Sequence, residues 1–257
     1  MLLTIDVGNT NIKLGLFDGS VLLESWRLGS SLSKTSDEYG LAILDFLRGH
    51  SYTAADVDGI ILASVIPDLN HTFERLSKYY FKLTPLTVGP GVKTGIAIKY
   101  DDPREVGADR IVNALAGYKL YGAPLTVIDF GTATTFNVVN GRGEFAGGPI
   151  APGIKIAGDA LAAGAARLPR FEYELPAKVV NKNTVSNMQA GVLYGAIGTV
   201  EYICARIKRE CIFETMKVIA TGGLSDVIAG GTSVINTVDK TLSLTGLRLV
   251  YEMNRAR

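Results

Sequence analysis

The sequence predicts an α/β protein made of two similar halves, each running βββαβα, and three observations support this. An apolar strand leads to Asp, one apolar residue and Gly twice, at 5–9 (IDVGN) and at 128–132 (IDFGT). More strand pattern follows each time. A helical pattern and then a buried strand ending in small residues complete both series. Because these features recur in the same order, we interpret the halves as a duplication.

The first half reads as three strands, a helix and a fourth strand. The segment 4–7 is apolar around one acid, and 12–17 alternates apolar with polar or small residues, which is typical of a half-buried strand. The segment 21–28 continues this pattern. Leucines recur on one stripe over 37–48, which predicts an amphipathic helix, and 59–64 (GIILAS) predicts a buried strand.

The second half repeats this order. Strands are predicted over 136–139 and 144–150, a long helix over 190–208, and a buried strand over 217–223 (KVIATGG). Residues 165–186 are polar, irregular and contain proline, so we expect an excursion from the core there.

We place the boundary between a first subdomain, 1–121, and a second, 122–257. The last element of the first is predicted to be a helix over 103–120, with an aspartate cap before it and proline in its first position. Asp239 is a candidate cap for a last helix running through Tyr251. That helix could pack back on the first subdomain.

Composition narrows the range of functions. The 257 residues carry a net charge of +1, with 47% hydrophobic and 20% charged residues, an ordinary globular balance. No basic excess indicates a nucleic-acid or anionic membrane surface. No apolar run reaches membrane-spanning length, and the N-terminus has no signal-peptide pattern. We expect a cytoplasmic protein that binds neither nucleic acid nor membrane.

Other patterns carry little chemistry. Cys204 and Cys211 lie on one face of a helical pattern, too far apart for a disulfide, and we expect reduced, mostly packed thiols. His50 and His71 are assigned no role. The segment 89–95 (GPGVKTG) lacks the glycine before lysine that a Walker-type phosphate loop needs.

The two Asp-containing hairpins are the strongest candidate site. If the halves face each other, Asp6 and Asp129 converge on one cleft, each beside glycine and hydroxyl or amide groups. Glycine lets backbone N–H groups approach a polyanion, but a carboxylate facing phosphate needs a cation between them. Thr221-Gly-Gly223 follows a buried strand and suits contact with adenosine. The alternative for a single motif is an aspartate that caps its own hairpin.

The order of motifs resembles type III pantothenate kinase, a family of the acetate and sugar kinase, Hsp70 and actin superfamily. The motifs are Asp6-Val-Gly-Asn-Thr10, Gly107-Ala-Asp-Arg110, Asp129-Phe-Gly-Thr-Ala-Thr-Thr135, Gly147-Gly-Pro-Ile-Ala-Pro-Gly153 and Thr221-Gly-Gly223. The first alone indicates only the superfamily, whereas the second and fourth indicate the family. The resemblance implies two ribonuclease H-like subdomains with a nucleotide cleft between them.

The resemblance also implies the site residues. The first ATP-binding loop would be Asp6, Val7, Gly8, Asn9, Thr10, Asn11, Ile12 and Lys13. Thr132 would bind ATP as well, Asp6 would lie near Mg²⁺, and Asp129 would hold a monovalent cation, K⁺ or NH₄⁺. The pantothenate site would be lined by Tyr100, Gly107, Ala108, Asp109, Arg110 and Thr184. Asp109 would accept the proton, and Thr184 would come from the partner chain of a homodimer.

The residues alone leave plainer readings open for two of these positions. Asp109 beside Arg110 in a helix is most often a solvated or structural ion pair. Gly107 in that helix would cost about 1 kcal/mol relative to alanine, which hints at a close approach. Tyr100 could be an ordinary packing residue.

The function that follows is ATP-dependent phosphorylation of pantothenate, the first step of coenzyme A synthesis, with Mg²⁺ and a monovalent cation. The nearest alternative is another small-molecule kinase of the superfamily. From a different class, the chain could be a non-catalytic nucleotide-binding regulator. ADP formation that depends on pantothenate would separate these readings.

Overall fold

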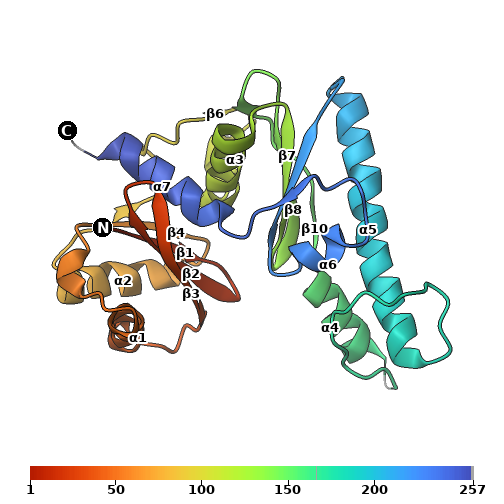
Figure 1. The fold of residues 1–257 in the computed structure, drawn as a ribbon, viewed down its shortest axis with the longest axis horizontal. Coiled ribbons are helices and arrows are strands. Elements are labelled where there is room, and N and C mark those ends of the chain that lie inside the picture. Colours follow the sequence, from red (N-terminus) through yellow and green to blue (C-terminus); the bar gives the residue numbers. More distant parts are fainter. Residues whose placement is uncertain (166, 256–257) are drawn as a thin grey trace. The chain divides into compact units, whose positions relative to one another are not determined.

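The computed structural model describes residues 1–165 and 167–255, and the chain forms two compact units (Figure 1). Unit 1 contains Met1–Gly95, Arg104–Ala116 and the C-terminal segment from Ser243, and unit 2 contains Ile96–Pro103 and Gly117–Leu242. The units are therefore not continuous in sequence. The division between residues 121 and 122 stays a prediction about the repeated halves.

The sheet of unit 1 has five strands. They are β1 (Leu2–Val7), β2 (Asn11–Asp18), β3 (Val21–Gly29), β4 (Gly59–Ser64) and β5 (Leu86–Thr87). Their order in the sheet is β3-β2-β1-β4-β5. β1 pairs antiparallel with β2 and parallel with β4. The predicted hairpin and the predicted buried fourth strand are confirmed.

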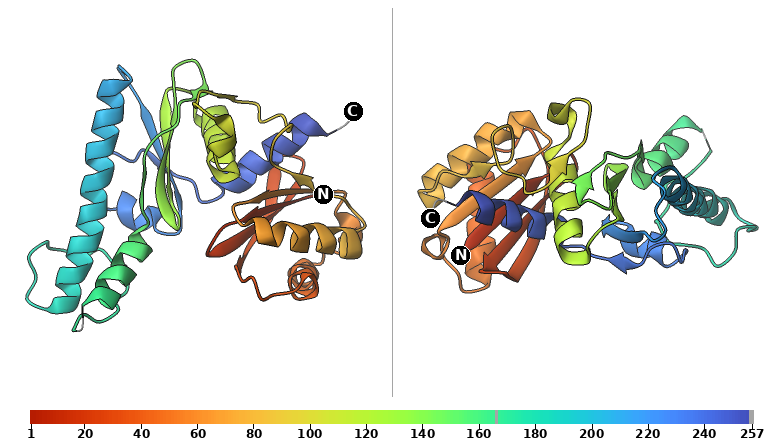
Figure 2. Two further views of the ribbon diagram at one scale, coloured as in Figure 1. Left: turned by 180° about the vertical axis from the view of Figure 1, so that it is seen from behind. Right: turned by 90° about the horizontal axis from the view of Figure 1, so that it is seen from above.

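The helices of unit 1 lie on both faces of this sheet. They are α1 (Ser36–Gly49), the short turn η1 (Ala54–Asp56), α2 (Pro67–Leu76), the π-helical turn η2 (Ser77–Phe81), most of α3 (Ala108–Tyr121) and α7 (Leu242–Asn254). A capping box at Thr35 and Glu38 starts α1. Figures 1 and 2 show α1 and α2 on one side of the sheet and α7 on the other.

Strand periodicity decides which side chains face which helices. Successive residues of a strand point to opposite faces of the sheet. The core against α1 and α2 contains, from the first two strands, Leu3, Ile5, Val7, Ile12, Leu14 and Leu16. Asp6 and Lys13 have the opposite parity, so they lie on the face that carries α7.

The sheet of unit 2 repeats the topology of unit 1. Its strands are β6 (Ala97–Ile98), β7 (Leu125–Phe130), β8 (Ala133–Val139), β9 (Glu144–Phe145), β10 (Ile150–Pro152), β11 (Lys217–Gly222) and β12 (Thr237–Val238). The order β12-β11-β7-β8-β9 matches β5-β4-β1-β2-β3, with parallel and antiparallel pairs in the same places. The predicted duplication is confirmed.

One face of the second sheet packs on long helices. These are α4 (Ile154–Gly164) and α5 (Thr184–Glu210). The short helix α6 (Ser225–Ala229), which follows β11 in the chain, contributes Ile228 to the same core. The core between them contains Ile128, Phe130, Phe136, Val138, Val218 and Ala220 of the sheet and Leu193, Ile197 and Val200 of α5. Asp129 has the opposite parity and faces away from α5. Among the described helices, none is both long and apolar enough to cross a membrane.

Two predicted helix starts are wrong. The helix predicted over 103–120 is a separate 3₁₀ turn, η3 (Pro103–Glu105), followed by α3 from Ala108. Gly107 accepts the first helical hydrogen bonds of α3, from the N–H groups of Arg110 and Ile111, so it lies at the helix start. The last helix begins at Leu242, because Asp239 instead bonds the backbone and hydroxyl of Thr241.

Two other predicted boundaries differ from the structure. The strand predicted over 144–150 is divided into β9 and β10, because Gly147 and Gly148 have φ values of +88° and +132°, which break a regular strand. The segment still bonds β8, since Ala146 donates to Val138 and Phe136 donates to Pro149. The long helix begins at Thr184, earlier than the predicted residue 190, with Asn183 as its cap.

Candidate active site

The first candidate loop is the turn between β1 and β2. Gly8 donates its N–H to the Asn11 carbonyl and closes the turn, while Asn9 and Thr10 are exposed at its tip. Asp6 and Lys13 are directly opposite each other on the paired strands. The loop thus presents a backbone turn, side-chain polar groups and a pair of opposite charges.

The Asp6–Lys13 pair explains how a carboxylate is kept at the end of a buried strand. The Lys13 ammonium nitrogen lies 3.6 Å from Asp6 Oδ2. Asp6 is only 7% exposed, and an isolated buried charge would be costly. This pairing is not among the predictions from the sequence. The signal was available, because a turn closed between Gly8 and Asn11 sets residues 6 and 13 opposite each other.

The second group lies at the start of α3. Ala108 is the first residue of the helix and Asp109 the second, so the Asp109 carboxylate lies in the first turn. A negative charge there is stabilised by the helix dipole. A Cβ atom added to Gly107 would collide with Asp109 Oδ1, so the carboxylate folds back over this glycine.

This geometry corrects our interpretation of Gly107. Gly107 precedes the first residue of α3, so the expected cost of a glycine inside a helix does not apply. It leaves room for the Asp109 carboxylate against the main chain. The neighbouring Arg110 is 6% exposed, so its guanidinium is not a freely solvated surface group.

The third group is the loop between β7 and β8 in unit 2. Asp129 is opposite Thr135 in the strand register, where the first loop has a lysine. Gly222, at the end of β11, has a φ of +95° and lies beside this aspartate. A Cβ atom on Gly222 would be 2.6 Å from the Phe130 carbonyl oxygen and 2.7 Å from Asp129 Oδ1. Gly222 thus packs closely against the Phe130 carbonyl and the Asp129 carboxylate, where a side chain would not fit.

Thr132 lies in the same loop and contacts the start of α4. A Cβ atom on Gly153, the N-cap residue of α4, would collide with the Thr132 carbonyl oxygen. The last glycine of the 147–153 motif is therefore needed for close packing between the loop and the helix. The structure brings two motifs that are separate in the sequence into direct contact.

Tyr100 packs against the first glycine of that same motif. Its ring stacks on Phe145 with centroids 6.4 Å apart, and a Cβ atom on Gly147 would lie 3.0 Å from the ring. Tyr100 remains 36% exposed, so one face of the ring is supported while the rest reaches solvent. Thr184, by contrast, is exposed at the first position of α5.

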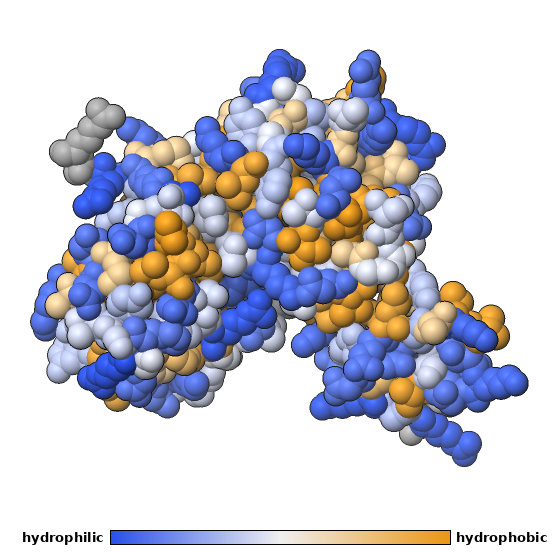
Figure 3. Space-filling model, viewed as in Figure 1, coloured by the Kyte–Doolittle hydropathy of each residue, from blue (hydrophilic) through white to orange (hydrophobic). Residues whose placement is uncertain are grey.

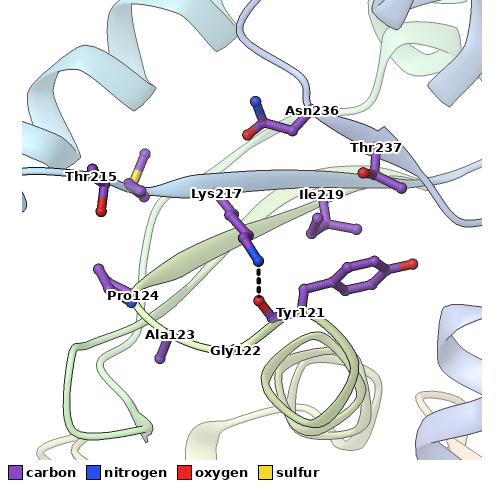
Figure 4. A pocket seen from close by; sticks show the side chains of 10 residues that line it. Tyr121, Gly122, Ala123, Pro124, Thr215, Lys217, Ile219, Asn236 and Thr237 are labelled. Atoms are coloured by element: carbon purple, nitrogen blue, oxygen red, sulfur yellow. Dashed lines mark hydrogen bonds between the residues drawn. The ribbon is translucent and has the colours of Figure 1, made fainter.

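A pocket of about 580 Å³ in unit 2 is separate from these groups (Figure 4). Among its lining residues, Lys217 donates to the Tyr121 carbonyl at 2.7 Å. Burial, followed by the hydrogen bond to Asp239, raises the pKa of Tyr121 from 10.0 to about 12. Lys217 is the first residue of β11, whereas Gly222 beside Asp129 is its last. Ligands of parallel sheets bind at the carboxyl ends of strands, so this pocket does not belong to the candidate site.

Comparison with known proteins identifies the family. A family model described as type III pantothenate kinase matches residues 2–206. Type III pantothenate kinases of Geobacillus kaustophilus (strain HTA426) and Geobacillus sp. (strain WCH70) are each 52% identical over 254 residues, which covers 99% of this chain and 98% of each relative. The chain belongs to the type III pantothenate kinase family. The resemblance found in the sequence motifs is confirmed.

Solved structures resemble this family member in fold. A conserved Baf family protein from Campylobacter jejuni superposes with a TM-score of 0.63 at 19% identity, covering 98% of both chains. The activator of 2-hydroxyisocaproyl-CoA dehydratase from Clostridium difficile, with bound ADPNP, has a TM-score of 0.54 at 12% identity, covering 96% and 91%. The polyphosphate/ATP-glucomannokinase from Arthrobacter sp. strain KM has 0.50 at 14%, covering 99% of each. The predicted duplicated ribonuclease H-like architecture is thereby confirmed.

The residues that the pantothenate kinase resemblance assigns to cations fit oxygen-liganded ions. Mg²⁺ that accompanies a nucleotide needs only one or two protein carboxylates, because phosphates and waters complete its shell. Asp6 can provide one such carboxylate. The Asp129 carboxylate and the neighbouring Phe130 carbonyl are hard oxygen donors of the kind that such cations prefer. Within the described part of the chain, no cluster of three or more His, Cys, Asp or Glu side chains forms a separate metal site.

The two cysteines of this pantothenate kinase family member take no part in these groups. Both thiols are free. Cys204 is buried in the α5 core, and burial raises its pKa from 9.0 to about 12. Cys211 is exposed just beyond α5. The two cysteines were predicted to share one face of a helix and to be mostly packed, but only Cys204 is buried.

Proposed function

We propose that the chain transfers the γ-phosphate of ATP to the primary hydroxyl group of pantothenate, which is the first step of coenzyme A synthesis. The observation that carries this proposal is the 52% identity to type III pantothenate kinases over 99% of the chain. The motifs that indicated the family lie at strand ends, in the turns between strands and at helix starts. A kinase that uses ATP with a divalent metal follows from the family.

The ATP-binding residues are proposed to come from both Asp-containing loops. Gly8, Asn9 and Thr10 provide backbone and side-chain donors at the tip of the first loop, and Lys13 provides a cation for a phosphate oxygen. In the second loop, Thr132 lies against the start of α4. When Mg²⁺ is bound with ATP, it neutralises phosphate charge, and Asp6 is the residue that would hold it.

Pantothenate is proposed to bind at Tyr100 and at the start of α3, where Asp109 accepts the hydroxyl proton. Phosphoryl transfer needs this proton to leave as the new bond to phosphorus forms. The position of Asp109 in the first turn of α3 favours its ionised form, which is the form that can accept a proton. Gly107 allows the carboxylate to take its place against the turn. Arg110 is proposed to line the same site.

Asp129 is proposed to hold K⁺ or NH₄⁺. The support is the chemistry of the position: the Asp129 carboxylate and the carbonyl of the next residue, Phe130, are two oxygen donors that both lie beside Gly222. A larger, weakly hydrated cation suits such a site beside a nucleotide loop, because it adds positive charge without octahedral demands.

The enzyme is proposed to act as a homodimer in which Thr184 completes the partner's substrate site. Thr184 opens α5, and this helix, the segment before it and α4 carry exposed apolar residues: Ile156, Leu161, Val179, Val180 and Val185. Figure 3 shows orange side chains interspersed with blue ones on this part of unit 2. Exposed apolar side chains that gather in one region are one mark of an interaction site.

The test is an assay of ADP formation by the purified protein with Mg²⁺, K⁺ and ATP. We expect ADP to form only when pantothenate is added, in equal amount to a phosphorylated product seen by mass spectrometry. Other small primary alcohols should give no comparable rate. ADP formation that ignores pantothenate, or ATP binding without turnover on any acceptor, would overturn the proposal.

A further inference from the structure

The buried hydroxyl group of Ser243, in α7, contacts Lys13 of the proposed first ATP-binding loop. Ser243 is the second residue of α7 and is 1% exposed. Its Oγ atom lies 3.5 Å from the Lys13 ammonium nitrogen, although the two residues are 230 positions apart in the chain. No sequence pattern indicated this contact. Lys13 therefore has Asp6 on its own hairpin and Ser243 on the helix that covers it.

The packing of α7 fixes the place of Ser243. Leu244 lies against Gly15 of β2, where an added Cβ atom would be 3.1 Å from its Cδ1 atom. Gly246 lets the helix approach α3 so closely that a Cβ atom there would collide with the Val112 carbonyl. These contacts flank Ser243 on both the strand that carries Lys13 and the helix that carries Asp109. The hydroxyl is thus held on a rigid support.

A lysine needs such a support to keep one position. Its ammonium group is a point charge on a flexible four-carbon chain, with three donors that can turn freely. The ion pair with Asp6 offsets the cost of partly burying the Lys13 ammonium group. On its own, it restrains that group from one side only. A hydroxyl on a second element limits the remaining rotation. Groups placed before the substrate arrives lose less entropy on binding it.

We propose that Ser243 is a positioning residue, which holds the Lys13 ammonium group where it meets a phosphate oxygen of ATP. This inference rests on the proposed function, because it takes the first loop to be an ATP site. It makes α7 part of the nucleotide site through Lys13, without direct contact between the helix and ATP. The C-terminal helix then has a role in function as well as in packing.

The test measures ATP affinity by titration calorimetry, with Mg²⁺ and without pantothenate. Ser243→Ala should weaken ATP binding about threefold to tenfold, the loss expected for one hydrogen bond. KM for pantothenate at saturating ATP should not change. The matched control is Ser77→Ala, which removes another fully buried hydroxyl of unit 1, one that donates to the Phe73 carbonyl. It should lower the thermal midpoint to a similar extent and leave ATP affinity unchanged.

A double-mutant cycle with Lys13→Met shows whether Ser243 acts through the lysine. In the Lys13→Met background, Ser243→Ala should cause no further loss of ATP affinity. If Lys13→Met itself leaves affinity unchanged, the proposed ATP loop is wrong. If Lys13→Met weakens binding but Ser243→Ala does not, or the two losses multiply, only the positioning role is overturned.

Discussion

At the residue scale, Asp109 shows how a local backbone arrangement prepares a chemical group. The carboxylate lies in the first turn of α3 and folds over Gly107, which has no side chain to displace it. The helix start lowers the energy of the charged form. A carboxylate that is ionised and held in place is what a proton acceptor for an alcohol requires.

Asp109→Asn tests this role. The change keeps the shape of the side chain but removes the proton acceptor, so kcat should fall about 10²–10⁴-fold. The lower end is expected if proton transfer is late in a loose transition state. ATP affinity and the thermal midpoint should stay close to those of the parent. Asp101→Asn, at an exposed acid in the preceding loop, is the control and should keep full activity. A rate within about twofold of the parent would mean that Asp109 only positions substrate.

Asp129→Asn tests the monovalent cation. Removing the negative charge should weaken binding of K⁺ or NH₄⁺, because the remaining carbonyl oxygen carries only a partial charge. The parent should be active in K⁺ and much less active in Na⁺, and this difference should shrink in the variant. Asp159→Asn, on the exposed side of α4, should retain the parent's K⁺ dependence. Equal rates of the parent enzyme in Na⁺ and K⁺ buffers would contradict the assignment.

At this scale, the sequence predicted those features whose geometry depends only on neighbouring residues in the chain. The hairpin containing Asp6 and the strand end at Asp129 were predicted, because apolar alternation interrupted by glycine is visible in the chain. The Lys13–Ser243 contact was not, because it joins the two ends of the chain through packing that no local pattern encodes. Gly107 was placed in a helix interior, because the proline at 103 looked like a helix start.

At the element scale, the division of the strand predicted over 144–150 shows how glycines with tertiary contacts override a local pattern. The strand predicted over 144–150 has the right composition, but its glycines are placed by what they touch. A Cβ atom at Gly148 would collide with the Phe136 carbonyl of β8. Propensity and periodicity describe a chain segment alone, whereas this turn is decided by its neighbouring strand.

Gly148→Ala should therefore destabilise unit 2. A side chain at a φ of +132° is strained by about 1–3 kcal/mol, and the collision with β8 adds to this cost. Urea unfolding should show a lower midpoint, with the slope unchanged. Gly141→Ala is the matched control, since no atom lies within 4 Å of its added Cβ. It should change the free energy of unfolding by less than about 0.5 kcal/mol. Equal midpoints for the two variants would show that the turn adapts.

At the scale of the whole molecule, the duplication places two equivalent aspartates in different surroundings. Five strands have the same order in both sheets, and the two aspartates lie near the carboxyl ends of β1 and β7, which hold matching places in that order. Asp6 has a lysine opposite, and Asp129 has a threonine. The same fold element thus offers a carboxylate paired with a cation in one unit and a carboxylate opposite a hydroxyl group in the other. The topology was readable from the sequence, because the repeated order of strands and helices specifies it.

The membership of the compact units was harder to predict. Unit 1 takes its third segment from the far end of the chain, and α3 belongs to it only as far as Ala116. Two glycines mark where α3 passes from one unit to the other. Gly246 permits the close contact between α7 and α3 in unit 1, and Gly117 of α3 lies against Val127 in unit 2. A glycine in a helical pattern does not reveal which element approaches it. The repeat was therefore visible in the sequence, while the segments that complete each unit were not.

The last prediction concerns assembly. If the exposed apolar residues around Thr184 form the homodimer interface, Val180→Glu should weaken dimerisation, because it puts a charge into a surface that loses water on association. Val180 is 86% exposed, so folding of the single chain should be unaffected. Light scattering and activity measured over a dilution series should fall together, at higher protein concentration in the variant than in the parent. Val21→Glu, at an exposed valine of β3, should change neither curve. A monomer with full activity would contradict the assignment of Thr184 to the partner's site, because such a monomer would need no residue from a second chain.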